Sequence, residues 1–158
     1  ILRNFLKKIQ LKIQNNMKPG VITLDGFLGS DTRNLIDILT EDDAEVKRME
    51  LTHERIAEGM AAFREEGRKG LGEFIHVDPH FDVKVDSVRG KLPSPFGGPG
   101  LYPKNNTTVV NKHLGKTVWF SDLQIHLIRD HGFYEGKGSR FRLEPKELVE
   151  VLEISTGE

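Results

Sequence analysis

The chain contains no cysteine, which excludes disulfide bonds, thiolate metal sites and cysteine nucleophiles. The absence of thiols fits the reducing cytoplasm, where we expect the protein to be located. No apolar run approaches the ~18 residues that a transmembrane helix requires. The formal net charge is only −1 at pH 7, so the chain as a whole gives no strong signal for binding nucleic acid or membranes.

The composition that is present is typical of a globular domain. The chain has 158 residues, of which 37% are hydrophobic and 30% charged. This length is sufficient for one domain with its own core. Residues 1–16 contribute +4 to the net charge of −1, so the remainder contributes −5. We therefore divide the chain into a basic N-terminal extension, residues 1–16, and a single domain, residues 17–158.

The N-terminal extension is amphipathic at helical spacing, with basic residues between the apolar ones. Three interpretations fit this pattern. The segment could lie upstream of a native start at Met17, act as a membrane-surface helix or targeting peptide, or pack on the body or on a second subunit. The apolar positions are Leu2, Phe5, Leu6, Ile9 and Ile13.

The most regular pattern lies in residues 75–86, which read IHVDPHFDVKVD. Apolar residues or proline alternate with polar residues, and this period of two predicts a strand with one face in the core. Pro79 lacks the N–H that an interior ladder position requires. It therefore favours an edge strand, a bulge or the meeting point of two strands.

Helical periodicity predicts one long helix over about 41–68. Met49, Ile56 and Met60 share a stripe, and Thr40 can cap the start. Two shorter helices follow near the C-terminus. Ser121 can cap a helix over 122–131, and Pro145 is suited to the first position of the last helix.

Strand candidates at 107–111 and 116–120 lie between the long helix and the C-terminal helices. Residues 91–106 contain four prolines and three glycines, which predicts a long ordered connection without regular structure. The order of elements indicates an α+β fold. We expect a small, mostly antiparallel sheet flanked by the long helix and the two shorter C-terminal helices.

The polar face of residues 75–86 is a candidate metal site. His76, Asp78 and His80 alternate along one side of the predicted strand, about 6–7 Å apart between successive Cα atoms. Imidazole and carboxylate groups so placed could hold a divalent metal ion. The alternative is a solvated outer strand face, which must be polar in any case.

The helix over 122–131 carries the second candidate site. Asp122, His126 and Asp130 follow i, i+4 and i+8, so each carboxylate can reach the imidazole. If the protein is an enzyme, this group could supply a general base with an orienting carboxylate. A solvated helix face with ion pairs is the alternative.

The segment 133–142, FYEGKGSRFR, is the third candidate and predicts a ligand-binding loop. Two glycines free its backbone, and its basic and aromatic side chains could hold a small anion. The alternative is a plain connection with exposed basic residues. The residues that we expect to bind the ligand are Tyr134, Lys137, Arg140 and Arg142.

These candidates leave two functions open. The first is a binding or assembly module for a small anionic ligand or a partner protein. The second is a metal-dependent hydrolase that uses the strand 75–86 and the helix 122–131. Whether the protein is an enzyme is undecided, because no nucleophile elbow or HExxH motif is present. A homodimer formed by the N-terminal helix or an exposed strand edge fits either function.

Overall fold

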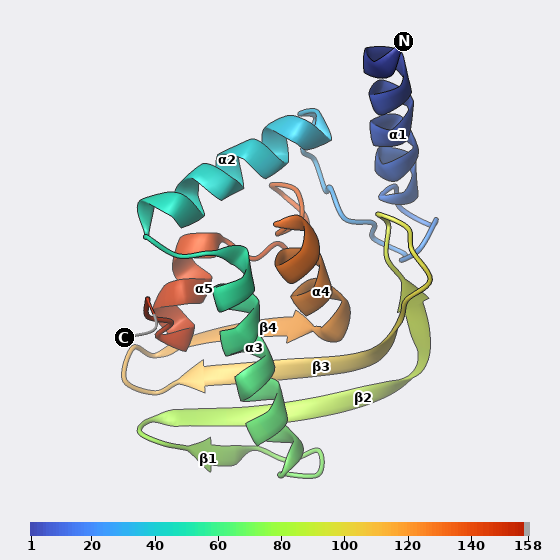
Figure 1. The fold of residues 1–158 in the computed structure, drawn as a ribbon. Helices are drawn as coiled ribbons and strands as arrows, with labels where there is room; N and C mark the ends of the chain where they lie inside the picture. Colours follow the sequence, from blue (N-terminus) through green and yellow to red (C-terminus); the bar gives the residue numbers. More distant parts are fainter. Residues whose placement is uncertain (157–158) are drawn as a thin grey trace.

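The α+β fold class predicted from the sequence is confirmed by a computed structural model, which describes residues 1–156. The last two residues of the predicted domain, 157–158, lie outside this described part. Residues 1–156 form five helices and one four-stranded sheet (Figure 1). The helices are α1 (Leu2–Asn16), α2 (Leu35–Arg48), α3 (His53–Arg68), α4 (Asp122–His131) and α5 (Pro145–Leu152). The strands are β1 (Ile75–Val77), β2 (Phe81–Pro93), β3 (Leu101–Asn111) and β4 (Lys116–Ser121).

The sheet is a meander in which each strand pairs antiparallel with the next, in the order β1-β2-β3-β4. β2 and β3 form a long hairpin whose register shifts between Val88 and Lys91. Most of the segment 91–106, which we expected to be irregular, belongs to these two strands. Only residues 94–100 connect them. Composition misled the prediction here because the pairing between the strands, and not local propensity, decides their extent.

The alternating stretch 75–86 forms two strands joined at Pro79, one of the arrangements that this proline favoured. β1 precedes the cis Asp78–Pro79 peptide bond, and β2 follows it. Phe81, Val83 and Val85 are buried, as the period of two predicts. The stretch therefore contributes the inner face of β2 to the core.

The region predicted as one long helix over 41–68 consists of most of α2 and all of α3. Glu50 adopts a left-handed backbone conformation (φ 59°), and the Thr52 side chain caps α3 by accepting a hydrogen bond from the Arg55 N–H at 3.1 Å. The turn lets both helices direct apolar residues inward. This turn could not be predicted from the sequence because the helical periodicity of apolar residues continues on both sides of it.

The main core lies between one face of the sheet and the helices α3, α4 and α5 (Figure 1). A second core lies on the other side of α4, where α2 and the segment that contains Met17 and Phe27 pack. α4 thus carries apolar residues on more than one side, as its sequence predicts. Residues of the main core include Met60, Val83, Val109, Phe120, Ile128 and Leu148, and those of the second core include Leu35, Ile38, Leu123 and Leu127.

α1 projects from the body beside α2 and buries none of its residues (Figure 1). Its apolar side chains Leu2, Phe5 and Leu6 are exposed. Within the described residues, no helix combines the length and apolar character needed to cross a membrane.

A glycine sets how closely α3 approaches the sheet, and substituting it tests the packing. A Cβ atom on Gly67 would lie 2.6 Å from Val83 Cγ1 and 2.9 Å from Val85 Cγ2. We expect Gly67→Ala to lower the free energy of unfolding by about 1–3 kcal/mol, because overpacking outweighs the higher helix propensity of alanine. Urea unfolding measures this loss.

Gly59→Ala in the same helix is the matched control. Its Cβ atom would lie 3.0 Å from Cγ1 and 3.1 Å from Cδ1 of Ile154, a side chain outside the helices and strands that can shift more easily than the sheet. We expect its effect to stay within about 1 kcal/mol, since alanine favours the helix. Equal losses for the two variants would contradict the packing argument.

Candidate ligand-binding site

The loop that follows α4 places one acidic residue inside the protein. Gly132 ends the helix in a left-handed conformation, and the next two residues, Phe133 and Tyr134, are both buried. Phe133 enters the second core and Tyr134 enters the main core. The two aromatic residues thus anchor the chain in different cores, and the residue that follows them, Glu135, is only 4% exposed.

Glu135 is held by side-chain and backbone contacts. Its Oε1 accepts a hydrogen bond from Ser139 Oγ at 2.7 Å, and its Oε2 accepts one from Gln124 Nε2 at 2.9 Å. Its backbone carbonyl accepts a bond from Arg142 Nη1 at 2.6 Å. Glu135 also has a left-handed backbone (φ 71°), which is costly for a residue with a side chain. Such strain persists only where the surroundings impose it and is frequent at functional sites.

The neighbouring Gly136 allows a second segment to lie against this loop. The Gly136 N–H donates to the Phe27 carbonyl at 2.8 Å, and a Cβ atom at position 136 would lie 2.3 Å from the Leu28 carbonyl oxygen. A side chain larger than hydrogen would separate the two segments. The glycine therefore brings the segment that contains Phe27 next to Glu135.

A cavity of about 210 Å³ lies where this segment, the end of β4 and the loop meet. Most of the lining surface is apolar, and the polar residues in the lining include Gln124 and Glu135. An apolar cavity with a few convergent polar groups is the usual form of a small-molecule site. The lining residues on which the argument depends are Phe27, Lys104, Trp119, Gln124, Glu135 and Phe141.

Burial changes the acidity of Glu135. Loss of solvation raises the pKa of this carboxyl group from 4.5 to about 7, although the hydrogen bonds from Ser139 and Gln124 and the charge of Arg142 act in the opposite direction. Near neutral pH the group therefore exists in both protonation states. An acid with a perturbed pKa in a cavity is a candidate functional group.

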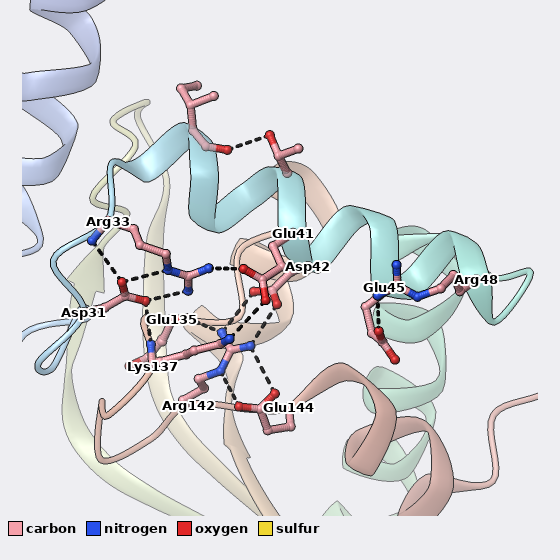
Figure 2. A network of polar contacts seen from close by, with 12 residues as sticks. Asp31, Arg33, Glu41, Asp42, Glu45, Arg48, Glu135, Lys137, Arg142 and Glu144 are labelled. Carbon is pink, nitrogen blue, oxygen red and sulfur yellow. Dashed lines mark hydrogen bonds and ion pairs between the residues drawn. The ribbon is translucent and has the colours of Figure 1, made fainter.

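A buried ion pair supports the loop behind Glu135 (Figure 2). Arg142 donates two hydrogen bonds to Asp42 of α2, at 2.8 and 3.0 Å, and two to Glu144, at 2.7 and 3.2 Å. The side chains of Arg142 and Asp42 are only 5% and 6% exposed. The fork geometry of the guanidinium group thereby ties the loop to α2.

Ion pairs nearer the surface also connect this loop to α2 and to the segment before it (Figure 2). Lys137 pairs with Glu41 through a 3.0 Å contact, and its backbone N–H donates to Asp31 at 2.9 Å. Asp31 also accepts a hydrogen bond from Arg33 at 2.6 Å. The hydrogen bond from Arg33 is the main cause that holds the pKa of Asp31 far below its usual range.

The four residues predicted to bind an anion are brought together only in pairs: Arg140 and Arg142 line one cavity, and Lys137 and Arg142 line another. Tyr134 is buried in the main core, and Lys137 and Arg142 pair with carboxylates of α2. Arg140 is largely exposed and lies 3.8 Å from Asp25. Because carboxylates already face these cations, the arrangement lends the anion site no support, and that site stays a prediction.

The structure brings two of the three predicted metal residues together and gives the third another partner. His76 Nε2 lies 3.1 Å from Asp78 Oδ1, whereas His80 Nε2 lies 2.6 Å from Glu153 Oε2 near the end of the chain. Across residues 1–156, no group of three or more His, Asp or Glu side chains is arranged to hold a metal ion. The divalent-metal site and the hydrolase that would use it remain predictions.

The predicted group on α4 is brought together in part. His126 Nδ1 lies 2.9 Å from Asp130 Oδ2, in agreement with the i, i+4 spacing, and also 2.9 Å from the Tyr102 hydroxyl. Asp122 instead accepts a hydrogen bond from Asn105. Burial lowers the pKa of the His126 imidazole, although the charge of Asp130 opposes this shift. The catalytic role of the three residues stays a prediction.

Sequence reasoning did not single out three residues that define the cavity: Trp119, Gln124 and Glu135. Glu135 lies within the segment that we selected, but its basic neighbours directed attention to anions. The sequence did offer one signal for this site: in residues 133–136, two aromatic residues precede an acid and a glycine. The burial of that acid could not be read from the sequence, because segment 23–27, which helps to enclose it, is more than a hundred positions away.

Comparisons with family models, curated proteins and solved structures found no match. The cavity and its chemistry are therefore the basis for proposing a function.

Proposed function

We propose that the protein is a binding module for a small organic molecule, which occupies the cavity beside Glu135. The observation that carries this proposal is that Glu135, a buried acid, lines a cavity whose surface is mostly apolar. Apolar walls supply binding energy, and one buried polar group fixes the orientation of the ligand. This function retains the binding module expected from the sequence and moves its site from the basic side chains of the loop to the acid beneath them.

Filling the cavity tests the proposal. Asn106 lines the cavity from β3, where an aromatic residue suits a strand. We expect fragments of up to about ten non-hydrogen atoms to raise the melting temperature of the wild type, because a ligand that binds only the native state stabilises it. The same fragments should have little effect on Asn106→Phe. Differential scanning fluorimetry of a fragment set measures both.

Val110→Phe is the matched control. Val110 lies on the same strand and side of β3 as Asn106, four residues further along, and outside the cavity lining. Its response to fragments should equal that of the wild type. If no fragment stabilises the wild type, or if both variants respond as the wild type does, the cavity is not a binding site.

A further inference from the structure

We infer that the ligand of this cavity is a small organic cation with N–H donors, such as a protonated amine, held by the carboxylate of Glu135. The inference rests on the proposed function and adds the chemical class of the ligand. Hydrogen-bonding capacity, local charge and the nature of the walls each support it.

The first argument is the unused capacity of Glu135 to accept hydrogen bonds. An ionised carboxylate can accept about four hydrogen bonds, and the Glu135 side chain accepts two, from Ser139 and Gln124. Gln124 cannot serve a ligand instead. Its amide N–H groups donate to Glu135 and to the Phe141 carbonyl, and its oxygen accepts from the Ser121 N–H. A ligand must therefore offer donors to the acid.

The second argument is the lack of an ion-pair partner for the Glu135 carboxylate. Lys104 also lines the cavity, but among residues 1–156 neither it nor any other base forms an ion pair with Glu135. The neighbouring bases have other partners: Arg140 lies 3.8 Å from Asp25, and Arg142 pairs with Asp42 and Glu144. A cationic ligand would supply the missing counter-charge, whereas an anion would be repelled by the carboxylate.

The third argument is the character and size of the walls. The rings of Phe27, Trp119 and Phe141 line the cavity, and aromatic rings attract cations as well as apolar groups. The volume of about 210 Å³ equals roughly seven water molecules at ~30 Å³ each. The ligand is therefore compact, with a body about the size of one six-membered ring.

Benzylamine, benzyl alcohol and benzoate test the inference, because they share a ring and differ in charge. Trp119 is the only tryptophan of the chain and lines the cavity, so its single indole N–H signal in an NMR titration reports on binding. At about pH 8, where Glu135 is mostly ionised, we expect benzylamine to bind about tenfold or more tightly than benzyl alcohol. Benzoate should not bind measurably.

Glu135→Gln should remove the preference for benzylamine over benzyl alcohol, whereas Glu147→Gln on the exposed side of α5 should keep it. A second measurement needs no variant. At pH 7, benzylamine binding to the wild type should release a fraction of a proton, since the cation ionises the Glu135 carboxyl groups that are still protonated. Calorimetry in two buffers of different ionisation enthalpy measures this release.

The possible outcomes separate the inference from the proposed function. If benzyl alcohol or benzoate binds as tightly as benzylamine, the cavity is a binding site but the cationic class is wrong. Binding of benzylamine without proton release, or with full strength in Glu135→Gln, also overturns the class. If none of the three probes shifts the Trp119 signal and the fragment set has no effect, the proposed function itself fails.

Discussion

Replacing Arg142 by methionine is expected to lower the free energy of unfolding by about 3–5 kcal/mol. The substitution removes the guanidinium group from Asp42, whose side chain is only 6% exposed, and leaves that carboxylate without its ion-pair partner. It also removes the hydrogen bond to the Glu135 carbonyl, which holds the left-handed backbone of that residue. Urea unfolding followed by Trp119 fluorescence measures the loss.

Arg140→Met provides the matched control two positions away. The Arg140 side chain is 74% exposed and its one ion pair is 3.8 Å long, so we expect a change within about 0.5 kcal/mol. In Arg142→Met, an additional Asp42→Leu substitution should restore much of the loss, because an apolar pair leaves no buried charge. If Arg142→Met and Arg140→Met lose similar stability, the buried ion pair does not hold the loop.

Glu135→Gln is expected to change how stability depends on pH. The native pKa of Glu135 is raised by burial to about 7, above its ordinary value of 4.5, so the native state binds more protons than the unfolded state between these values. Its contribution to stability is therefore complete at low pH and is lost as the pH rises through this window. Between about pH 4.5 and pH 8, the wild type should lose roughly 3 kcal/mol relative to the variant.

Other groups titrate in the same window, so the difference between variant and wild type is the quantity to measure. Arg142, Lys104 and Asp25 are the charged neighbours of the Glu135 cavity, and both proteins retain them. Glu147→Gln, an exposed carboxyl group on α5, should follow the wild type at each pH. Parallel curves for wild type and Glu135→Gln would show that Glu135 titrates as an ordinary solvated acid.

Local patterns predicted the fold where neighbouring residues decide the structure. The period of two in 81–85 predicted the buried face of β2, and Ser121 predicted the cap of α4, which the structure shows as a complete capping box with Gln124. Pro145 likewise opens α5. These features depend on hydrogen bonds and burial within a few positions, so the neighbouring residues are sufficient to predict them.

The errors arose where distant pairing decided the structure. Most of the proline- and glycine-rich segment 91–106 belongs to strands, because β2 and β3 pair as far as Pro93 and Leu101. The turn before Thr52 divides a continuous helical pattern because it lets Val46 at the end of α2 and Ile56 of α3 pack in the same core. Neither the pairing of these strands nor the turn between these helices changes the local periodicity of the sequence, so periodicity alone could not predict them.

The candidate site shows the same division. The sequence by itself determined that segment 133–142 combines aromatic, acidic, basic and glycine residues, and that α4 is covered on more than one side. Only the tertiary structure decided that the basic residues Lys137 and Arg142 face carboxylates of α2 while Glu135 faces a cavity. The physical reason is that burial and charge pairing depend on which distant segments meet, and residues 23–27, α2 and β4 meet this loop only in the folded chain.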